Sequence, residues 1–179
     1  MSNWHERIRE AVAEVVPELS RLSAYERYRD VIPKARPPAT ERQIAKYEQY
    51  LGLRLPPSYR AFLELYNGYE WLAFPGHMLA IEEVMPEGDY YDDIKEWKTV
   101  MAEAGLGDAL DGVVVAYLDQ PNNWAYLDPN RAGVDGELNL ALHVAGADPF
   151  FYPTVDEFIR SAGARAGLAL TWAEGSAKG

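Results

Sequence analysis

The chain has 179 residues, of which 48% are hydrophobic and 12% aromatic, so it is long enough to bury a hydrophobic core and too apolar to stay disordered. It contains no cysteine, which excludes disulfides, thiolate metal sites and cysteine nucleophiles and fits a cytoplasmic protein. Its net charge of −11 disfavours nucleic acids and anionic membranes as partners, and no apolar run has the length of a signal core or a membrane span.

Residues 1–39 are expected to form a helical segment packed onto the domain behind it, because so short a stretch cannot build a core of its own. Residues 4–16 predict an amphipathic helix that Pro17 interrupts, and residues 20–30 predict another short helix. The connector that follows is expected to be extended because it holds three prolines, Pro33, Pro37 and Pro38.

Two short helices with clear end signals are predicted next. Thr40 and Gln43 form a capping box for the first helix, and Gly52 ends it. Pro57 lies in the first turn of the second helix, which stops at Asn67-Gly68. Two short helices cannot bury their apolar faces alone, so we expect a sheet to cover them.

After Gly68 the pattern changes to short strands. Residues 69–74 and 78–84 predict a hairpin around the turn Pro75-Gly76. An acidic loop follows, and it leads into a helix that ends near Gly105 and has three apolar residues at helical spacing, Ile94, Trp97 and Met101.

The last third of the chain predicts three more strands and a closing helix. The strands are expected at residues 113–118, 124–128 and 138–144, and Thr154 caps the helix. The tail, residues 173–179, is expected to be disordered. Strands joined by short turns pair antiparallel, so the fold class is α+β. We expect a single domain of residues 40–172, in which an antiparallel sheet of about five to six strands packs against the N-terminal helices and a C-terminal helix.

Four stretches resemble one known family. The first helix is followed by G-L-x-L-P-P-S-Y-R-x-F-L and by Y-N-G-x-x-W, in residues 52–63 and 66–71. Leu127-Asp128 ends a strand, and Pro153-Thr154 with Phe158 opens the last helix. This pattern is similar to the SUKH superfamily, which is named partly for a fungal cell-wall regulator and is abundant as bacterial immunity proteins. The resemblance, from about Thr40 to Arg160, implies a SUKH-like fold and a protein partner such as a secreted toxin.

Negative charge gathers in the second part of the chain. Residues 1–60 hold 11 Lys and Arg against 8 Asp and Glu, a net of +3, whereas residues 61–179 hold 6 against 20, a net of −14. The excess either keeps the surface soluble or complements a basic partner. Residues 82–96 carry seven carboxylates against Lys95 alone but lack a calcium-loop pattern, so we expect no metal.

Three segments are candidates for the partner surface because they place aromatic residues beside polar or acidic ones. Tyr91 is as consistent with binding a partner as with packing inside the fold, whereas we expect Trp97 to pack its helix onto the sheet. The candidate residues are Tyr69, Glu70 and Trp71 at the hairpin, Glu87, Asp89, Tyr90, Tyr91, Asp92 and Asp93 in the acidic segment, and Gln120, Asn122, Asn123 and Trp124 at a polar turn.

No catalytic motif is visible, and the three histidines, His5, His77 and His143, lack metal-ligand spacing. We therefore expect a non-enzymatic binding protein without a cofactor. The leading hypothesis is an immunity protein that docks on a toxin, in particular a basic, nuclease-like one. The alternative is an intracellular scaffold or regulatory module with no toxin partner. A hydrolase or a metal-dependent enzyme is the third hypothesis.

Overall fold

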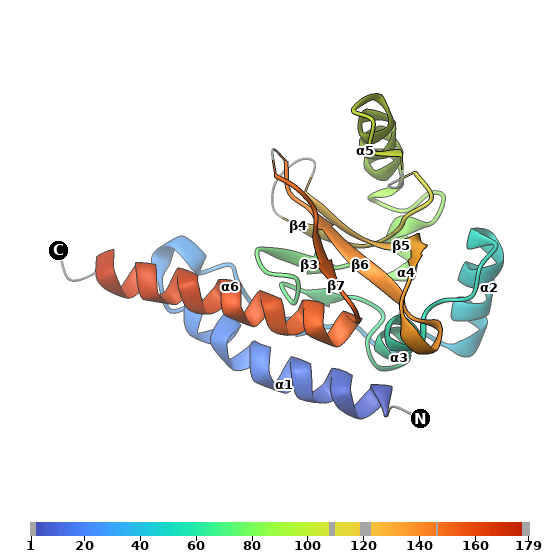
Figure 1. Cartoon of the computed structure of the whole chain (residues 1–179). Helices are drawn as coiled ribbons and strands as arrows, with labels where there is room; N and C mark the ends of the chain where they lie inside the picture. Colours follow the sequence, from blue (N-terminus) through green and yellow to red (C-terminus); the bar gives the residue numbers. More distant parts are fainter. Residues whose placement is uncertain (1–2, 108–109, 119–122, 146, 177–179) are drawn as a thin grey trace.

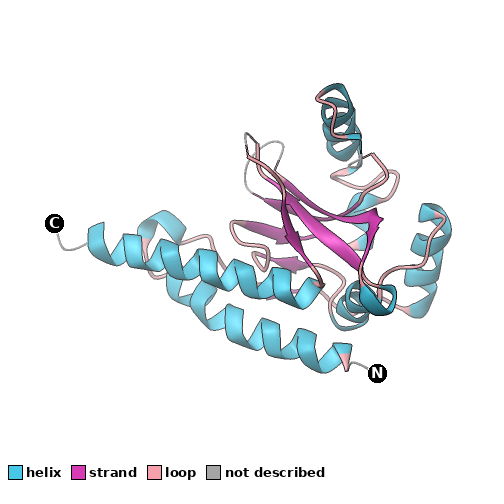
Figure 2. Ribbon diagram, viewed as in Figure 1, coloured by secondary structure: helices cyan, strands magenta, loops and turns pink. Residues whose placement is uncertain are grey.

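The computed structural model describes residues 3–107, 110–118, 123–145 and 147–176. These residues form a seven-stranded antiparallel sheet in the order β1-β2-β3-β4-β5-β6-β7, with helices on both sides (Figures 1 and 2). The chain therefore has the α+β fold predicted from the sequence. Its elements are α1 (Trp4–Leu22), η1 (Glu26–Tyr28), β1 (Lys34–Ala35), α2 (Glu41–Leu51), α3 (Pro57–Leu65), β2 (Tyr69–Glu70), β3 (Gly76–Met78), α4 (Ile81–Val84), α5 (Tyr91–Glu103), β4 (Val113–Leu118), β5 (Trp124–Ala132), η3 (Val134–Gly136), β6 (Leu138–His143), β7 (Phe150–Tyr152) and α6 (Val155–Ser176).

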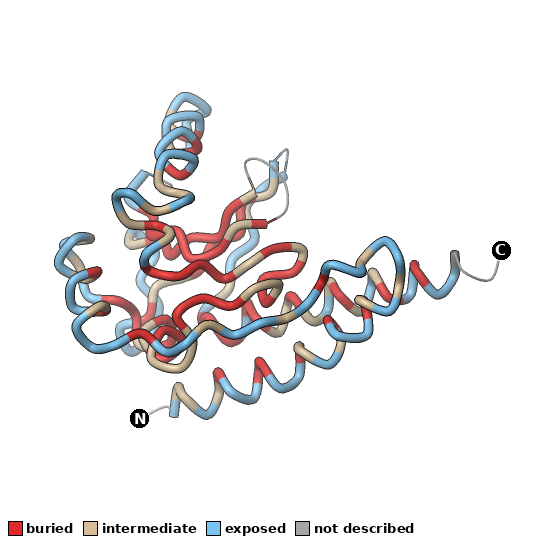
Figure 3. Tube along the Cα trace, turned by 180° about the vertical axis from the view of Figure 1, so that it is seen from behind, coloured by how far each residue is buried: buried red, intermediate tan, exposed pale blue. Residues whose placement is uncertain are grey.

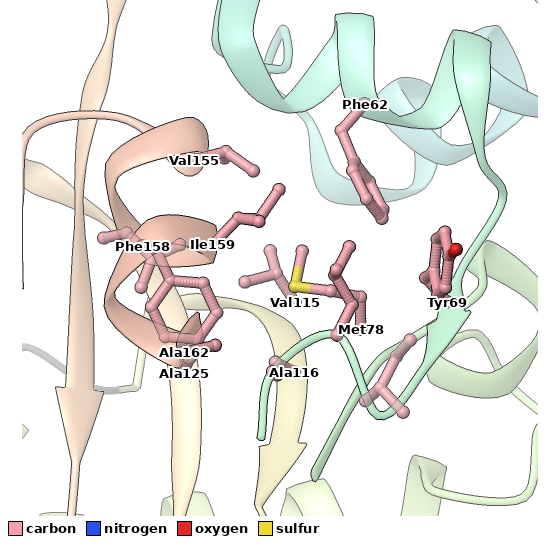
Figure 4. Close-up of a cluster of buried hydrophobic side chains, with 14 of the residues drawn as sticks. Phe62, Tyr69, Met78, Val115, Ala116, Ala125, Val155, Phe158, Ile159 and Ala162 are labelled. Carbon is pink, nitrogen blue, oxygen red and sulfur yellow. The ribbon is translucent and has the colours of Figure 1, made fainter. Parts of the chain in front are cut away.

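Helix α6 packs directly on the sheet, and α1 lies along α6 (Figure 1). In the close-up of Figure 4, Phe158 and Ile159 of α6 point toward Val115 and Ala125 of the sheet, and Phe62 of α3 closes the same cluster. These side chains are fully buried. In Figure 3, buried residues follow the strands and the inner sides of the helices, as expected for a sheet that packs against helices.

Helix α5 covers the opposite face of the sheet. The ring centroid of Trp97 lies 6.1 Å from that of Trp124 and 5.5 Å from that of Tyr126. Successive residues of a strand point to opposite faces, so Trp124 and Tyr126 face α5 while Ala125 between them faces α6. The prediction that Trp97 packs is confirmed, since it is 2% exposed.

The end signals of α2 and α3 act as predicted. The Thr40 hydroxyl accepts from the Gln43 N–H while the Gln43 side chain accepts from the Thr40 N–H, which completes the capping box. Gly52 ends α2 with φ of 69° in the left-handed region, and Pro57 opens α3. These local signals are therefore sufficient to predict the bounds of both helices without any tertiary contact.

Some elements differ from the prediction because tertiary contacts override local signals. Helix α1 continues through Pro17 to Leu22, since its buried stripe against α6 extends to Leu19 and Leu22. Residues 20–30 form only the end of α1 and the short η1. The expected strand 78–84 ends at Met78, because Asn67 accepts from the N–H of Ile81 at 3.0 Å and starts α4 there.

The sheet has two more strands than the five named from the sequence. The short edge strands β1 and β7 were not predicted, and they pair with β2 and β6. The tail expected to be disordered from residue 173 is helical to Ser176, because Ala173 is buried and Glu174 lies 3.6 Å from Arg21 of α1. Residues 177–179 lie outside the described part. The domain boundaries at residues 39 and 172 stay predictions.

Candidate partner-binding surface

The acidic segment begins with a tight turn between α4 and α5. Gly88 packs so closely that a Cβ there would lie 2.2 Å from the carbonyl oxygen of Glu82, and its N–H donates to Met85 at 2.8 Å. Glu87 just before it has φ of 72°. The N–H of Ile94 then donates to the Tyr90 carbonyl and starts the helix. The turn leaves the side chains of Glu87 and Asp89 exposed to solvent.

Two of the seven carboxylates in this region are structural. Glu82 accepts from Asn67 at 2.7 Å and also contacts Gln43, and Glu83 pairs with Arg36 at 2.6 Å. The other five are exposed, and none of them forms an ion pair with any residue that the structure describes. We call them the acidic ridge: Glu87, Asp89, Asp92, Asp93 and Glu96.

Beside the ridge lies a tyrosine pair that joins α2 to α5. Tyr50, which is 46% exposed, faces Tyr91, and partial burial followed by the interaction with the Tyr91 hydroxyl raises the pKa of Tyr50. The Lys95 ammonium lies 5.4 Å from the centre of the Tyr91 ring. Both tyrosines line a cavity of about 200 Å³ between the helices. Tyr91 is thus half-buried, with its hydroxyl facing α2 and part of its ring beside the acids.

Tyr50 was missed in the sequence. A signal was present, since Ile44, Tyr47 and Leu51 define the apolar stripe of α2 and Tyr50 lies off that stripe. An aromatic residue on the solvent side of an amphipathic helix is a candidate for binding.

Tyr90 and Trp124 belong to the aromatic layer under α5. Tyr90 is half-buried, with its ring centre 5.4 Å from Tyr117 and 6.1 Å from Trp124, and burial followed by the charge of Glu83 raises its pKa. Trp124 is 3% exposed, which corrects its placement on a partner surface. Its position at the start of β5 turns the ring inward onto Trp97.

Asn123 is the described residue of the polar turn before Trp124, and it is half-buried. The side chain of Asn123 accepts from the N–H of Ala145 at 2.9 Å, which ties Asn123 to the residues that follow β6. Gln120 and Asn122 lie outside the described residues. The binding role predicted for Gln120, Asn122 and Asn123 stays a prediction.

The hairpin candidates lie elsewhere. Tyr69 is 7% exposed, with its ring 5.4 Å from Tyr66, and Glu70 lies 3.7 Å from Lys34. Trp71 is half-buried and has φ of 67°, a left-handed conformation that costs a bulky residue about 1–3 kcal/mol. Trp71 lines a cavity of its own, so the structure does not join it to the acidic ridge.

The histidines have structural surroundings. His5 contacts Glu64 at 2.8 Å, and His77 accepts from the N–H of Trp71 at 3.0 Å. His143 is buried beneath Trp97, and this burial lowers its pKa. Within the described ranges, no three His, Asp or Glu side chains come close enough to hold a metal ion.

Comparison with known proteins identifies one family. The model of the SMI1 / KNR4 family (SUKH-1) matches residues 38–161, from just before α2 into the first turns of α6. A search of curated proteins finds no match. The described helices include none with the length and apolar character needed to cross a membrane.

Proposed function

The chain belongs to the SMI1/KNR4 family (SUKH-1), and from this premise we propose that it is a non-enzymatic protein-binding domain of the cytoplasm that neutralises a cognate bacterial toxin by docking on it. The proposed partner is basic, as a nuclease with a positively charged substrate groove would be. Family membership supports a protein partner, and the acidic ridge supports its charge.

The observation that carries the proposal is the acidic ridge itself. Five exposed carboxylates without ion pairs in the described part of the chain surround the start of α5, and the tyrosine pair Tyr50–Tyr91 lies beside them. Uncompensated acids of this kind speed the encounter with a basic partner, and a half-buried tyrosine supplies contact area once the partner has docked.

Co-expression tests the function. We expect the chain to rescue cells from one particular toxin encoded beside it, and to bind that toxin with an association rate that falls steeply as salt rises. Rescue with a salt-independent rate would remove the electrostatic part of the proposal. Binding to a host protein without rescue from any toxin would favour the scaffold or regulatory module instead.

A double charge reversal locates the interface. Asp92→Lys with Asp93→Lys should slow association with the toxin by about tenfold or more at low salt. The matched control reverses Glu10 and Glu157, two exposed acids on α1 and α6, on the other side of the molecule from α5 (Figure 1). Both variants change the net charge equally, so equal rates for the two would show that the ridge is not the interface. Melting temperatures confirm that each variant is folded.

A further inference from the structure

We propose that this protein has a second docking site, a groove that binds a proline-containing peptide in the polyproline II conformation with a basic residue beside its prolines. The groove lies between η1, the turn from β2 to β3, and the C-terminal half of α6, and its volume is about 490 Å³. We call it the aromatic groove, because Tyr28, Trp71 and Phe74 line it together with Pro75. It is separate from the acidic ridge and does not depend on the function proposed above.

One of the three described non-glycine residues with a left-handed backbone, Trp71, lies in this groove; the other two are Glu87 and Asp135. Trp71 has φ of 67°, where glycine is favoured, and its N–H donates to His77 Nδ1 at 3.0 Å. Its ring centre lies 4.8 Å from that of His77. These contacts hold the tryptophan half-buried at the groove, where it also packs against the edge of the core. Since glycine would adopt this backbone without strain, the presence of tryptophan points to a use for its ring.

The surrounding rings come from segments far apart in the sequence. Tyr28 of η1 meets Phe74 edge to face, with ring centres 6.3 Å apart. Grooves lined by aromatic rings are the usual receptors for polyproline II peptides, whose proline rings pack between them and whose ordering on binding costs little entropy. Tyrosine and tryptophan also supply hydrogen-bond donors for the peptide carbonyls.

The adjacent sheet edge disfavours the main alternative, addition of a peptide strand. The edge strand here is β1, which has two residues, Lys34 and Ala35, between Pro33 and Pro37. Prolines carry no N–H and blunt a sheet edge against further pairing. A partner at this end of the molecule therefore meets side-chain rings more readily than backbone hydrogen bonds.

The charges at the groove select the flanking residue of the peptide. Arg27 stacks on Trp172, with the guanidinium carbon 4.7 Å from the ring centre, and so is already engaged by the protein. The Asp30 side chain is 88% exposed and has only a loose contact with Arg29, at 3.9 Å. The carboxylate of Asp30 is thus placed to accept a basic residue, which defines the charge of the peptide.

The groove extends beyond the part of the chain that the family model matches. The family match covers residues 38–161, whereas Arg27, Tyr28, Asp30 and Ala169 lie outside it. Only the turn with Trp71 comes from the matched region. The site therefore forms where the N-terminal and C-terminal segments of this chain meet the family domain.

Fluorescence titration of the full chain tests the proposal. The probe is the synthetic peptide Arg-Ala-Leu-Pro-Pro-Leu-Pro, compared with a version in which alanine replaces every proline and with a version in which glutamate replaces arginine. We expect saturable binding of the first peptide, about tenfold or more weaker binding without prolines, and a loss of a few-fold with glutamate. Equal binding of the proline and alanine peptides, or no saturation by either, would overturn the proposal.

Variants place the binding in the groove. Trp71→Gly keeps the left-handed backbone and removes the ring, so it should stay folded and bind at least about tenfold more weakly. Asp30→Lys should abolish the preference for arginine over glutamate, while the control Leu168→Ala, at an exposed position of α6, should bind as the parent does. Unchanged binding by a folded Trp71→Gly variant would refute the site. Sedimentation completes the test: self-association lost in Trp71→Gly would assign the groove to a second copy of the chain and also overturn the proposal.

Discussion

Replacement of Asp156 by alanine tests whether one buried carboxylate holds α1 against α6. The Asp156 side chain is fully buried, and its Oδ2 accepts hydrogen bonds from Arg7 at 2.8 Å and from Arg160 at 2.7 Å. Its Oδ1 accepts from the Thr154 hydroxyl at 2.7 Å. The helices run parallel, with both N-termini at this end, so the carboxylate also faces two positive helix ends (Figure 1).

The expected loss of stability depends on how far Arg7 and Arg160 can be hydrated once the carboxylate is removed. Removal of one partner from a buried ion pair costs about 3–5 kcal/mol. Here the Arg7 and Arg160 side chains are 35% and 34% exposed, and Arg160 keeps a bond to Glu14 at 2.9 Å, which lowers the cost. We expect Asp156→Ala to lose about 2–3 kcal/mol of unfolding free energy, a fall of roughly 5–10 °C in melting temperature for a chain of this size.

Urea and thermal unfolding followed by circular dichroism measure this loss. The matched control is Glu157→Ala, the next residue of the same helix turn, which is exposed and should change the unfolding free energy by less than about 0.5 kcal/mol. If the two variants differ by less than that amount, Asp156 does not hold the helices together and the reasoning fails.

Three further predictions concern pH, core packing and glycine. Burial, opposed by hydrogen bonds from Ser58, raises the pKa of Glu137, so its contribution to stability is full at low pH and is lost as pH rises through the folded-state pKa. The stability advantage of the parent over Glu137→Gln, from urea unfolding at several pH values, should therefore shrink toward neutral pH, and a constant difference would contradict this. Trp124→Ala should lose about 3–5 kcal/mol in the same assay because the ring is buried, whereas Trp172→Ala, 56% exposed, should lose less than about 1 kcal/mol; equal losses would place Trp124 outside the core. In α6, Gly167→Ala should raise the unfolding free energy by about 0.5–1 kcal/mol, since a Cβ there meets nothing within 4 Å. Gly163→Ala should give no gain, because its Cβ would lie 2.9 Å from Val15. An equal gain in the two variants would disprove that contact.

The parts of the fold that the sequence predicted are those set by local signals. The caps of α2 and α3 act within three or four residues, so Thr40, Gly52 and Pro57 are enough to place both helices. The family pattern depends on the same residues. The α+β class followed because strands and turns alternate after Gly68 along the chain.

What the sequence did not show depends on distant residues. Strand β1 exists because Ala35 pairs with Tyr69, and α1 continues past Pro17 because α6 covers its buried stripe. At the candidate surface, Asn67 and Arg36 engage two carboxylates that looked equivalent to the other five. Which acids are structural and which are exposed can be seen only in the folded structure. The same holds for the inward orientation of the Trp124 ring.

The parallel pairing of α1 with α6 has a consequence for synthesis of the chain on the ribosome. The contact between Arg7 and Asp156 spans 149 residues, so α1 must wait for the synthesis of α6 before this contact can form. Until then the apolar stripe of α1, with Ile8, Val15 and Leu19, has no partner on α6. Non-local closure of this kind slows folding and exposes apolar surface to aggregation. The apolar stripe of α1 therefore lacks this cover until α6 has been synthesised, although α3 can already contact α1.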